Sequence, residues 1–97
     1  MRFVVIFEDS PEMAAIRQKD EPAHLAYLET HRTEIQMAGG LRNEHGGLYV
    51  GGLWVFEVAS RERAVALIEG DPYFLAHPRQ YRLLAWGKAL PQYEVTL

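Results

Sequence analysis

The first residues of the chain place the strongest constraint on its fold. Residues 2–7 (RFVVIF) are apolar at nearly every position, so both alternating faces of an extended segment carry hydrophobic side chains. Residues 52–58 (GLWVFEV) repeat this pattern, with the large side chains of Trp54, Phe56 and Val58 on one face. A run of this kind is typical of a β-strand that is covered from two sides. The chain therefore has to build a sheet whose two faces are both protected from water.

Two helices are expected between these strands. Ser10-Pro11-Glu12 has the form of an N-cap followed by a proline and an acidic residue, which predicts a short helix to about Gln18. Pro22 suits the first position of a helix, and we predict that the main helix runs from Pro22 to about Met37, where Gly39-Gly40 ends it. Its apolar stripe consists of Leu25, Leu28 and Ile35, interrupted by Arg32.

The second half of the chain again alternates between strand and helix signals. The expected elements are a short strand at 41–45, the strand at 52–58, a helix capped by Ser60 and ended by Gly70, a short turn at 71–74, and a strand at 80–90 that Pro91 ends. The tail, residues 91–97, alternates at Tyr93, Val95 and Leu97. This alternation predicts one more short strand.

The order of these elements is β-α-β-β-α-β, with an extra helical turn after the first strand. This is the ferredoxin-like α+β arrangement, in which an antiparallel sheet carries both helices on one face. The other face stays uncovered, although the strands at 2–7 and 52–58 are apolar on both faces. An exposed apolar area of that size is unfavourable for a soluble monomer. We therefore predict a homodimer in which two sheets pack face to face as a barrel.

Length and charge limit the classes of function. Ninety-seven residues make one domain, 1–97, in which 91–97 is a tail. Ten basic and thirteen acidic side chains give a net charge of −3, which argues against a nucleic-acid partner. No apolar run approaches the ~20 residues of a membrane helix, and the apolar start is too short for a signal peptide. We expect a cytoplasmic protein that does not contact a membrane.

Metal and cofactor chemistry also lacks a sequence signal. The chain has no cysteine, and its histidines and carboxylates form no tight cluster with metal-ligand spacing. The paired glycines are not followed by the lysine and hydroxyl residue of a phosphate-binding loop. We therefore predict neither a metal site nor a cofactor.

His24 is the first candidate for chemistry. It stands two residues after Pro22, so the expected helix places it in the first turn, where the positive end of the helix dipole disfavours a second positive charge. A neutral imidazole in that position can accept a proton. The alternative is a buried histidine that hydrogen-bonds a backbone group, and this stretch taken alone favours that alternative.

Asp71 is the second candidate. An aspartate before a proline at a helix start is an ordinary N-cap, and capping alone, worth about 1 kcal/mol, explains its presence. The functional alternative is that its carboxylate binds one imidazole nitrogen of His24 and turns the other toward a substrate. The two residues are 47 positions apart, and that spacing does not decide between the alternatives.

Five segments together resemble the YCII family of YciI-like proteins. They are residues 3–8, 22–28 (PAHLAYL), 38–41 (AGGL), 52–58 and 70–74 (GDPYF), in the family's order along residues 1–90. The resemblance implies a dimeric ferredoxin-like α+β barrel, similar to the fold of muconolactone isomerases.

The same resemblance implies a role for two residues. Members of the family share a His–Asp pair proposed to act as an acid–base site, and His24 and Asp71 stand at the matching positions. The activity of the family is mostly unassigned, and some members are linked to the breakdown of aromatic compounds. Gly40 departs from the family pattern, in which proline often follows Ala-Gly, and this departure implies a looser loop beside the site.

Further residues are candidates for binding a substrate. Arg17, just ahead of the expected main helix, can bind an anionic substrate or can simply be a solvated surface charge. Four aromatic residues are candidates for the lining of an apolar pocket: Tyr27, Trp54, Tyr73 and Trp86. Trp54 stands on a strand without the basic residue that RNA-binding sheets carry, so pocket or core is the better interpretation.

These observations lead to three hypotheses about function. The first is a small enzyme of lyase, isomerase or hydrolase type, in which His24 is the acid or base, Asp71 orients it, and the substrate is a small, anionic, aromatic-derived molecule. The second is a dimeric ligand-binding or accessory module without catalysis. The third is an oxygenase, either cofactor-free or haem-dependent, on a related barrel.

Overall fold

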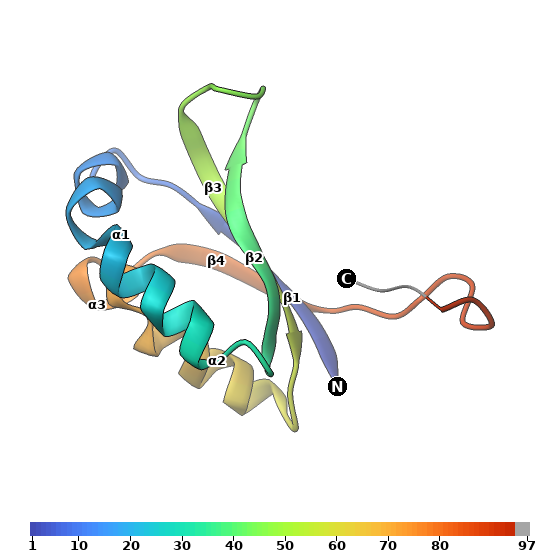
Figure 1. The fold of residues 1–97 in the computed structure, drawn as a ribbon. Helices are drawn as coiled ribbons and strands as arrows, with labels where there is room; N and C mark the ends of the chain where they lie inside the picture. The colour runs from blue at the N-terminus through green and yellow to red at the C-terminus, as the bar shows by residue number, and fades with distance from the viewer. Residues whose placement is uncertain (95–97) are drawn as a thin grey trace.

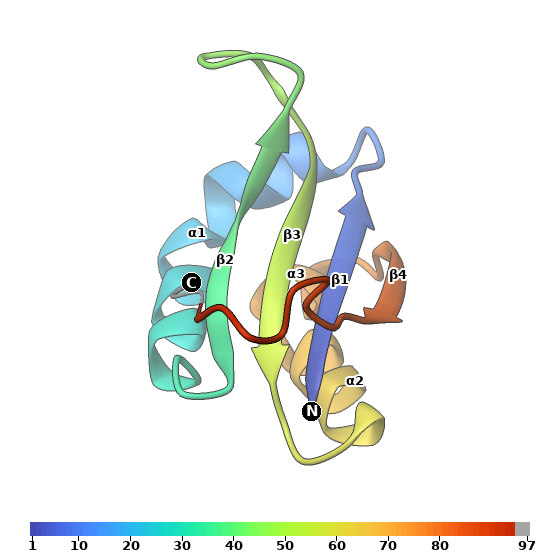
Figure 2. The ribbon, with the colours of Figure 1, turned by 90° about the vertical axis from the view of Figure 1, so that its right-hand side faces the viewer.

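A computed structural model describes residues 1–94 of the chain. The elements are, in order, β1 (Arg2–Glu8), α1 (Met13–Thr30), β2 (Ile35–Arg42), β3 (Tyr49–Glu57), α2 (Arg61–Gly70), α3 (Pro72–Ala76) and β4 (Gln80–Ala85). The four strands form one sheet in the order β2-β3-β1-β4, and every neighbouring pair is antiparallel. All three helices lie on the same face of this sheet (Figures 1 and 2). The predicted ferredoxin-like α+β fold is confirmed.

The two strands that are apolar on both faces form the centre of the sheet, β3 beside β1 (Figure 2). On the helix-covered face, alternate residues of β1 and β3 are buried: Phe3, Val5, Phe7, Trp54 and Phe56. On the open face, Val4 and Ile6 are only half-buried. The period of two residues in a strand explains this division, because successive side chains point to opposite faces. The core therefore lies between the sheet and the helices.

The first helix differs from the prediction. Residues 13–30 form one continuous helix with Pro22 inside it, instead of a short helix followed by a main helix that begins at Pro22. Proline inside a helix removes one backbone hydrogen bond and bends the axis, and the first turns of α1 run at an angle to the rest (Figure 1). The predicted apolar stripe is also wrong at Leu25, which is 54% exposed.

The end of this helix and the following strand were predicted too late in the sequence. α1 ends at Thr30 and β2 already begins at Ile35, so Gly39-Gly40 lies inside a strand and does not end a helix. The glycines serve a different purpose here. A Cβ atom on Gly40 would overlap the ring of Tyr49, which lies on β3 and covers that position of β2. The strand predicted at 41–45 is thus the end of β2 and the turn after it.

The last part of the chain leaves the sheet earlier than predicted. β4 ends at Ala85 instead of residue 90, and residues 86–94 are irregular. The backbone N–H of Trp86 donates to the carbonyl of Arg2, which is the first residue of β1, so the pairing of these two strands stops there. No strand forms at residues 92–94, and Val95 and Leu97 of the predicted tail strand lie outside the described residues.

The helices show two further features. Ser60 caps α2 as predicted, since its hydroxyl accepts a hydrogen bond from the backbone N–H of Arg63 at 3.1 Å. Within residues 1–94, none of the helices combines the length and the apolar character needed to cross a membrane.

Candidate functional site

The imidazole of His24 and the carboxylate of Asp71 are in direct contact. Nδ1 of His24 lies 2.7 Å from Oδ1 of Asp71. The side chain of Asp71 is completely buried, and that of His24 is 11% exposed. His24 projects from α1, and Asp71 is the single extended residue that joins α2 to α3, so the contact depends on the packing of α1 against α3.

The carboxylate of Asp71 does not cap a helix. Asp71 occupies the N-cap position of α3, but its side chain makes no capping hydrogen bond. Oδ1 points instead at His24, and Oδ2 is buried without a hydrogen-bond partner among the described residues. A buried carboxylate oxygen without a donor costs free energy. The usual explanation for an aspartate before a proline therefore does not apply here.

The environment of His24 comes from tertiary packing and not from a helix end. The prediction that it occupies a first helical turn is wrong, because it lies well inside α1. Its ring stacks on that of Tyr73 at 3.8 Å and 8°, and the ring of Trp54 lies 6.2 Å away. Among residues 1–94, no hydrogen-bond partner is found for Nε2, and this atom is not one of the fully buried polar atoms that lack a partner. Nε2 is thus free for contact with a ligand.

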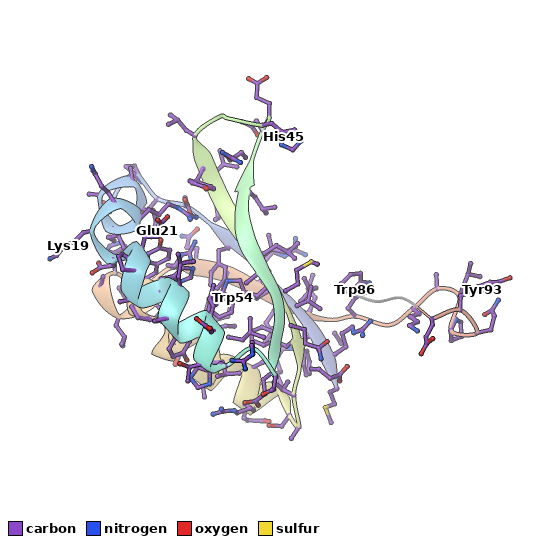
Figure 3. All side chains as sticks on the ribbon, viewed as in Figure 1. Lys19, Glu21, His45, Trp54, Trp86 and Tyr93 are labelled. Carbon is purple, nitrogen blue, oxygen red and sulfur yellow. The ribbon has the colours of Figure 1, made fainter. Side chains whose placement is uncertain are left out.

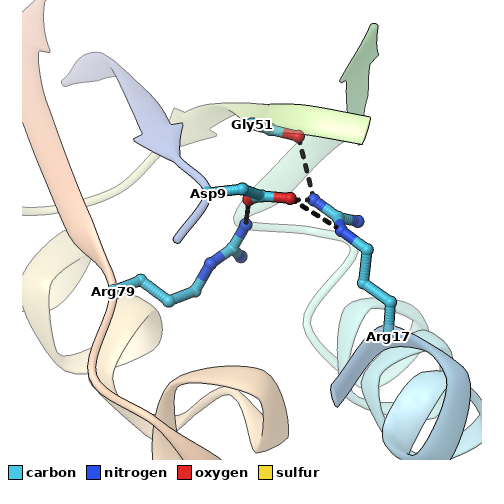
Figure 4. A network of polar contacts seen from close by, with 4 residues as sticks. All are labelled: Asp9, Arg17, Gly51 and Arg79. Carbon is cyan, nitrogen blue, oxygen red and sulfur yellow. Dashed lines mark hydrogen bonds and ion pairs between the residues drawn. The ribbon is translucent and has the colours of Figure 1, made fainter. Parts of the chain in front are cut away.

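A second polar cluster, which we call the arginine cluster, consists of Asp9, Arg17 and Arg79 (Figure 4). The Nε of Arg17 donates to Oδ2 of Asp9 at 3.0 Å, and its Nη2 donates to Oδ1 at 3.3 Å and to the carbonyl of Gly51 at 2.9 Å. Nη2 of Arg79 donates to Oδ1 of Asp9 at 3.1 Å. One carboxylate therefore holds two guanidinium groups.

Tyr73 links the two polar groups. It is stacked on His24, and the guanidinium carbons of Arg17 and Arg79 lie 5.7 Å and 5.8 Å from the centre of its ring. Burial raises the pKa of the Tyr73 hydroxyl, and the charge of Arg17 counteracts this only in part. Burial lowers the pKa of the Arg79 guanidinium, although the hydrogen bond with Asp9 opposes that shift. Both shifts follow from the burial of these side chains.

A large cavity lies beside these groups and not directly around His24. It has a volume of about 860 Å³ and is lined by residues 8–11 after β1, by Ala14, Arg17, Gln18 and Glu21 of α1, and by residues 47–50 at the start of β3. Arg17 and Glu21 precede His24 by seven and three residues, so they share its side of α1. The cavity is thus a continuation of the same helix face.

The structure separates the predicted aromatic residues into two groups. Trp54 and Tyr73 lie next to His24, with their rings 6.2 Å and 3.8 Å from the imidazole. Trp86 lies on the other side of the sheet (Figure 3), where it lines a cavity of about 310 Å³ with Arg2 and residues 87–90. Leu83 points into the core, so the strand period turns Trp86 to the open face. The structure therefore does not bring Trp86 to the site.

Tyr27 joins two helices. Its hydroxyl donates to the carbonyl of Leu67 in α2 at 2.8 Å. Gly70 makes this approach possible, because a Cβ atom there would lie 2.7 Å from the Tyr27 hydroxyl oxygen. Burial raises the pKa of Tyr27. Tyr27 thus fixes α1 against the end of α2, next to Gly70, which directly precedes Asp71. Its hydroxyl already donates a hydrogen bond to the carbonyl of Leu67.

Sequence reasoning identified Arg17 but missed Asp9 and Arg79. Arg17 was expected ahead of the main helix and lies within α1 instead. Asp9 directly follows β1, and a charged residue at the end of a buried strand was an available signal. Arg79 is 70 residues away from Asp9, and nothing local distinguishes it from a surface arginine. Across the described part of the chain, no three histidine or carboxylate side chains form a group suited to a metal ion.

Comparison with known proteins gives a family and a similar enzyme. The YCII-related domain family matches residues 1–90. A similar solved structure is the 5-chloro-2-hydroxyhydroquinone dehydrochlorinase TftG from Burkholderia phenoliruptrix AC1100, in complex with 2,5-dihydroxybenzoquinone. The two chains are 26% identical with a TM-score of 0.79, over 90% of this chain and 94% of TftG. The fold is thus similar to that of a lyase-type enzyme.

Two other results add no functional information. A protein from Agrobacterium tumefaciens is 12% identical with a TM-score of 0.38, over 92% of this chain and 96% of its own. A likeness this low supports no conclusion about fold or function. No curated protein sequence matches the chain.

Proposed function

Because the chain belongs to the YCII-related domain family, we propose that it is an acid–base enzyme of lyase type. His24 acts as the acid and base, and Asp71 is its partner. The substrate is a small hydroxylated aromatic or quinone-like molecule, as the likeness to TftG and its bound dihydroxybenzoquinone suggests. The family resemblance expected from the sequence is confirmed; the reaction and its residues form the proposal.

One observation carries this proposal. Nδ1 of His24 is held at 2.7 Å by a fully buried carboxylate, while Nε2 has no partner within the described residues. A carboxylate on one nitrogen fixes the tautomer of the ring and leaves the other nitrogen as the reacting atom. When Nε2 takes a proton from the substrate, the negative charge of Asp71 balances the imidazolium that forms.

In an elimination, the proton moves from the substrate to Nε2, and its electron pair forms the new double bond as the leaving group departs with the bonding electrons. The stacked ring of Tyr73 prevents the imidazole from tilting. Arg17 lines a cavity that reaches Glu21, one helical turn before His24, and is the candidate group for an anionic oxygen of the substrate. Trp54 contributes an apolar wall next to the imidazole.

The test is turnover with a matched control. Chlorinated hydroxyhydroquinones are supplied to the wild type, to H24Q and to H45Q, and chloride release is measured. H45Q removes an exposed histidine in the β2–β3 turn. We expect H24Q to lose about 10²–10⁴ in kcat and H45Q to match the wild type. Equal rates for all three proteins would contradict the assignment of His24.

The same experiment separates catalysis from simple binding. Titration with 2,5-dihydroxybenzoquinone, followed by its visible absorption, reports binding independently of turnover. Saturable binding without turnover of any hydroxylated aromatic substrate would favour the alternative, a ligand-binding or accessory module.

We also propose that the protein is a homodimer. The open face of the sheet has no helix on it (Figure 2), and it carries exposed or half-buried apolar residues on every strand: Val4, Ile6, Met37, Leu53 and Leu84. An apolar face of this kind fits a second copy of the same sheet. Sedimentation equilibrium at micromolar concentration should give twice the mass of 11.1 kDa, and a monomer would refute the proposal.

A further inference from the structure

The arginine cluster carries more positive than negative charge. Two guanidinium groups, those of Arg17 and Arg79, share the single carboxylate of Asp9. The side chains of Asp9 and Arg79 are 7% and 2% exposed, and that of Arg17 is 14% exposed. The charges of these three side chains sum to +1 where water provides little compensation, and the buried carboxylate of Asp71 acts on Arg79 through its charge without a hydrogen bond to it. A buried excess charge of this kind is expected to be balanced by a group of opposite sign.

Arg79 makes fewer hydrogen bonds than Arg17. Its Nε is buried and lacks a hydrogen-bond partner within residues 1–94. Its guanidinium carbon lies 4.1 Å from the centre of the Phe7 ring, so an aromatic face provides only part of its environment. Arg79 also lines a small cavity of about 260 Å³ with Asp9, Ser10 and His77. The group is thus bound to Asp9 on one side and under-satisfied on the other.

Arg17 presents this charge to the large cavity. Its Nε and Nη2 are used by Asp9 and by the carbonyl of Gly51, and Nη1 has no partner among the described residues. The guanidinium carbon lies 4.4 Å from the centre of the Tyr49 ring, and both residues line the cavity. Three hydrogen bonds and one ring therefore fix the guanidinium and leave one nitrogen free.

We propose that the arginine cluster is a binding site for an aromatic monoanion, whose charged oxygen is bound by Nη1 of Arg17 in the 860 Å³ cavity. Asp9 and Arg79 are positioning residues, because Asp9 orients Arg17, and Arg79 keeps the cluster positive. The aromatic ring of the ligand packs on Tyr49 and Leu48, which line the same cavity. This inference rests on the proposed function, since it names the charge class of the ligand for that cleft.

The cavity rim limits the charge that a ligand can carry. Glu8 and Glu21 line the same cavity, and both are exposed. Because they are in contact with water, they do not neutralise the buried cluster, but they repel a ligand with several negative charges. The site therefore favours one negative charge over two.

The test uses benzoate and benzamide, which have similar shapes and differ in charge. Binding is followed by NMR, through the Nε–H signal of Arg17 assigned from the R17K variant. We expect saturable binding of benzoate, with a shift of this signal, and at least tenfold weaker binding of benzamide, since a hydrogen bond to a charged group is worth about 1.5–3 kcal/mol. Equal binding of the two ligands, or no binding of benzoate, would overturn the proposal.

Variants of Arg79 test the role of charge. R79M brings the cluster to neutrality and should weaken benzoate binding by about tenfold, whereas R79K keeps the charge and should stay within about threefold of the wild type. E21Q removes a rim carboxylate and should tighten binding by about twofold. Equal weakening by R79M and R79K would indicate a purely packing role and contradict the positioning role. If R79M does not fold, the proposal is still tested by R79K, by E21Q and by the comparison of benzoate with benzamide.

The outcome is separable from that of the proposed function. H24Q should bind benzoate as tightly as the wild type does, because His24 does not line the cavity. In the active enzyme, R79M should raise KM and leave kcat within about threefold, while H24Q lowers kcat. Charge-dependent benzoate binding together with an active H24Q would refute the acid–base assignment alone. Loss of activity in H24Q with benzoate binding that ignores charge would refute the anion site alone.

Discussion

The carboxylates of Asp9 and Asp71 are both buried and are satisfied in different ways. Asp9 accepts three hydrogen bonds from two arginines. Asp71 has one hydrogen-bonding partner, His24, and a second oxygen without any within residues 1–94. The partners also differ chemically, since a guanidinium stays protonated in proteins and an imidazole exchanges its proton near neutral pH.

The difference separates a scaffold from a reacting group. A carboxylate between permanent cations has a fixed charge and a fixed geometry, and such a group positions its neighbours. A carboxylate whose only partner is a histidine belongs to a unit that can gain or lose a proton. We therefore expect changes at Asp71 to affect turnover and changes at Asp9 to affect stability and ligand binding.

The largest expected effect is on turnover in D71N. Asparagine keeps an oxygen near Nδ1 but removes the charge that balances an imidazolium, so kcat should fall by about 10²–10⁴. Thermal unfolding should change little, because size and burial are preserved. The control is E29Q, an exposed change on α1 that should leave kcat unchanged. A D71N enzyme with the wild-type kcat would remove the distinction between the two carboxylates.

The next effect is on stability in D9A. Removing the carboxylate leaves two largely buried guanidinium groups without a counter-charge, and breaking a buried ion pair in this way costs about 3–5 kcal/mol of unfolding free energy. Urea denaturation measures this loss. The matched control is E34A, which removes an exposed Glu34–Arg63 pair of the same chemistry and should cost much less. Similar losses in D9A and E34A would show that burial of the cluster has no energetic consequence.

The smallest expected effect is an alkaline loss of stability through Tyr73. Burial raises the pKa of Tyr73 in the folded state, so the folded protein favours the protonated phenol. The stabilisation is complete below the ordinary tyrosine pKa of about 10 and is lost as the pH rises through the folded-state pKa. Urea midpoints measured up to pH 11 should fall less in Y73F than in the wild type. Parallel curves for the two proteins would contradict this linkage.

The sequence contains enough information for the fold and too little for the site. Alternation at Phe3, Val5 and Phe7, and again at Trp54 and Phe56, is a local property that predicts the strands, but because both faces are apolar it does not predict which face the helices cover. The predicted end of the first helix was wrong because Gly39-Gly40 is compatible both with a helix end and with a strand that passes under the ring of Tyr49.

The site depends on contacts between distant segments. His24 and Asp71 are 47 residues apart, and the family resemblance, not spacing, suggested their pairing. Arg79 reaches Asp9 across 70 residues, and a single sequence contains no sign of that contact. Arg17 could be named because it stands just ahead of the expected main helix, but its orientation depends on Asp9 and on the carbonyl of Gly51.

The strand order has a consequence for how the protein is made. β4 pairs with β1, so the strand of this sheet that is synthesised last completes it beside the strand that is synthesised first. Asp71 and Arg79 emerge just ahead of or next to that strand. A nascent chain that stops before residue 71 holds His24 without Asp71, and it holds the Arg17–Asp9 pair without Arg79. Long-range pairing of this kind is slow to form, and the two polar groups are therefore complete only after α3 and the start of β4 have been synthesised.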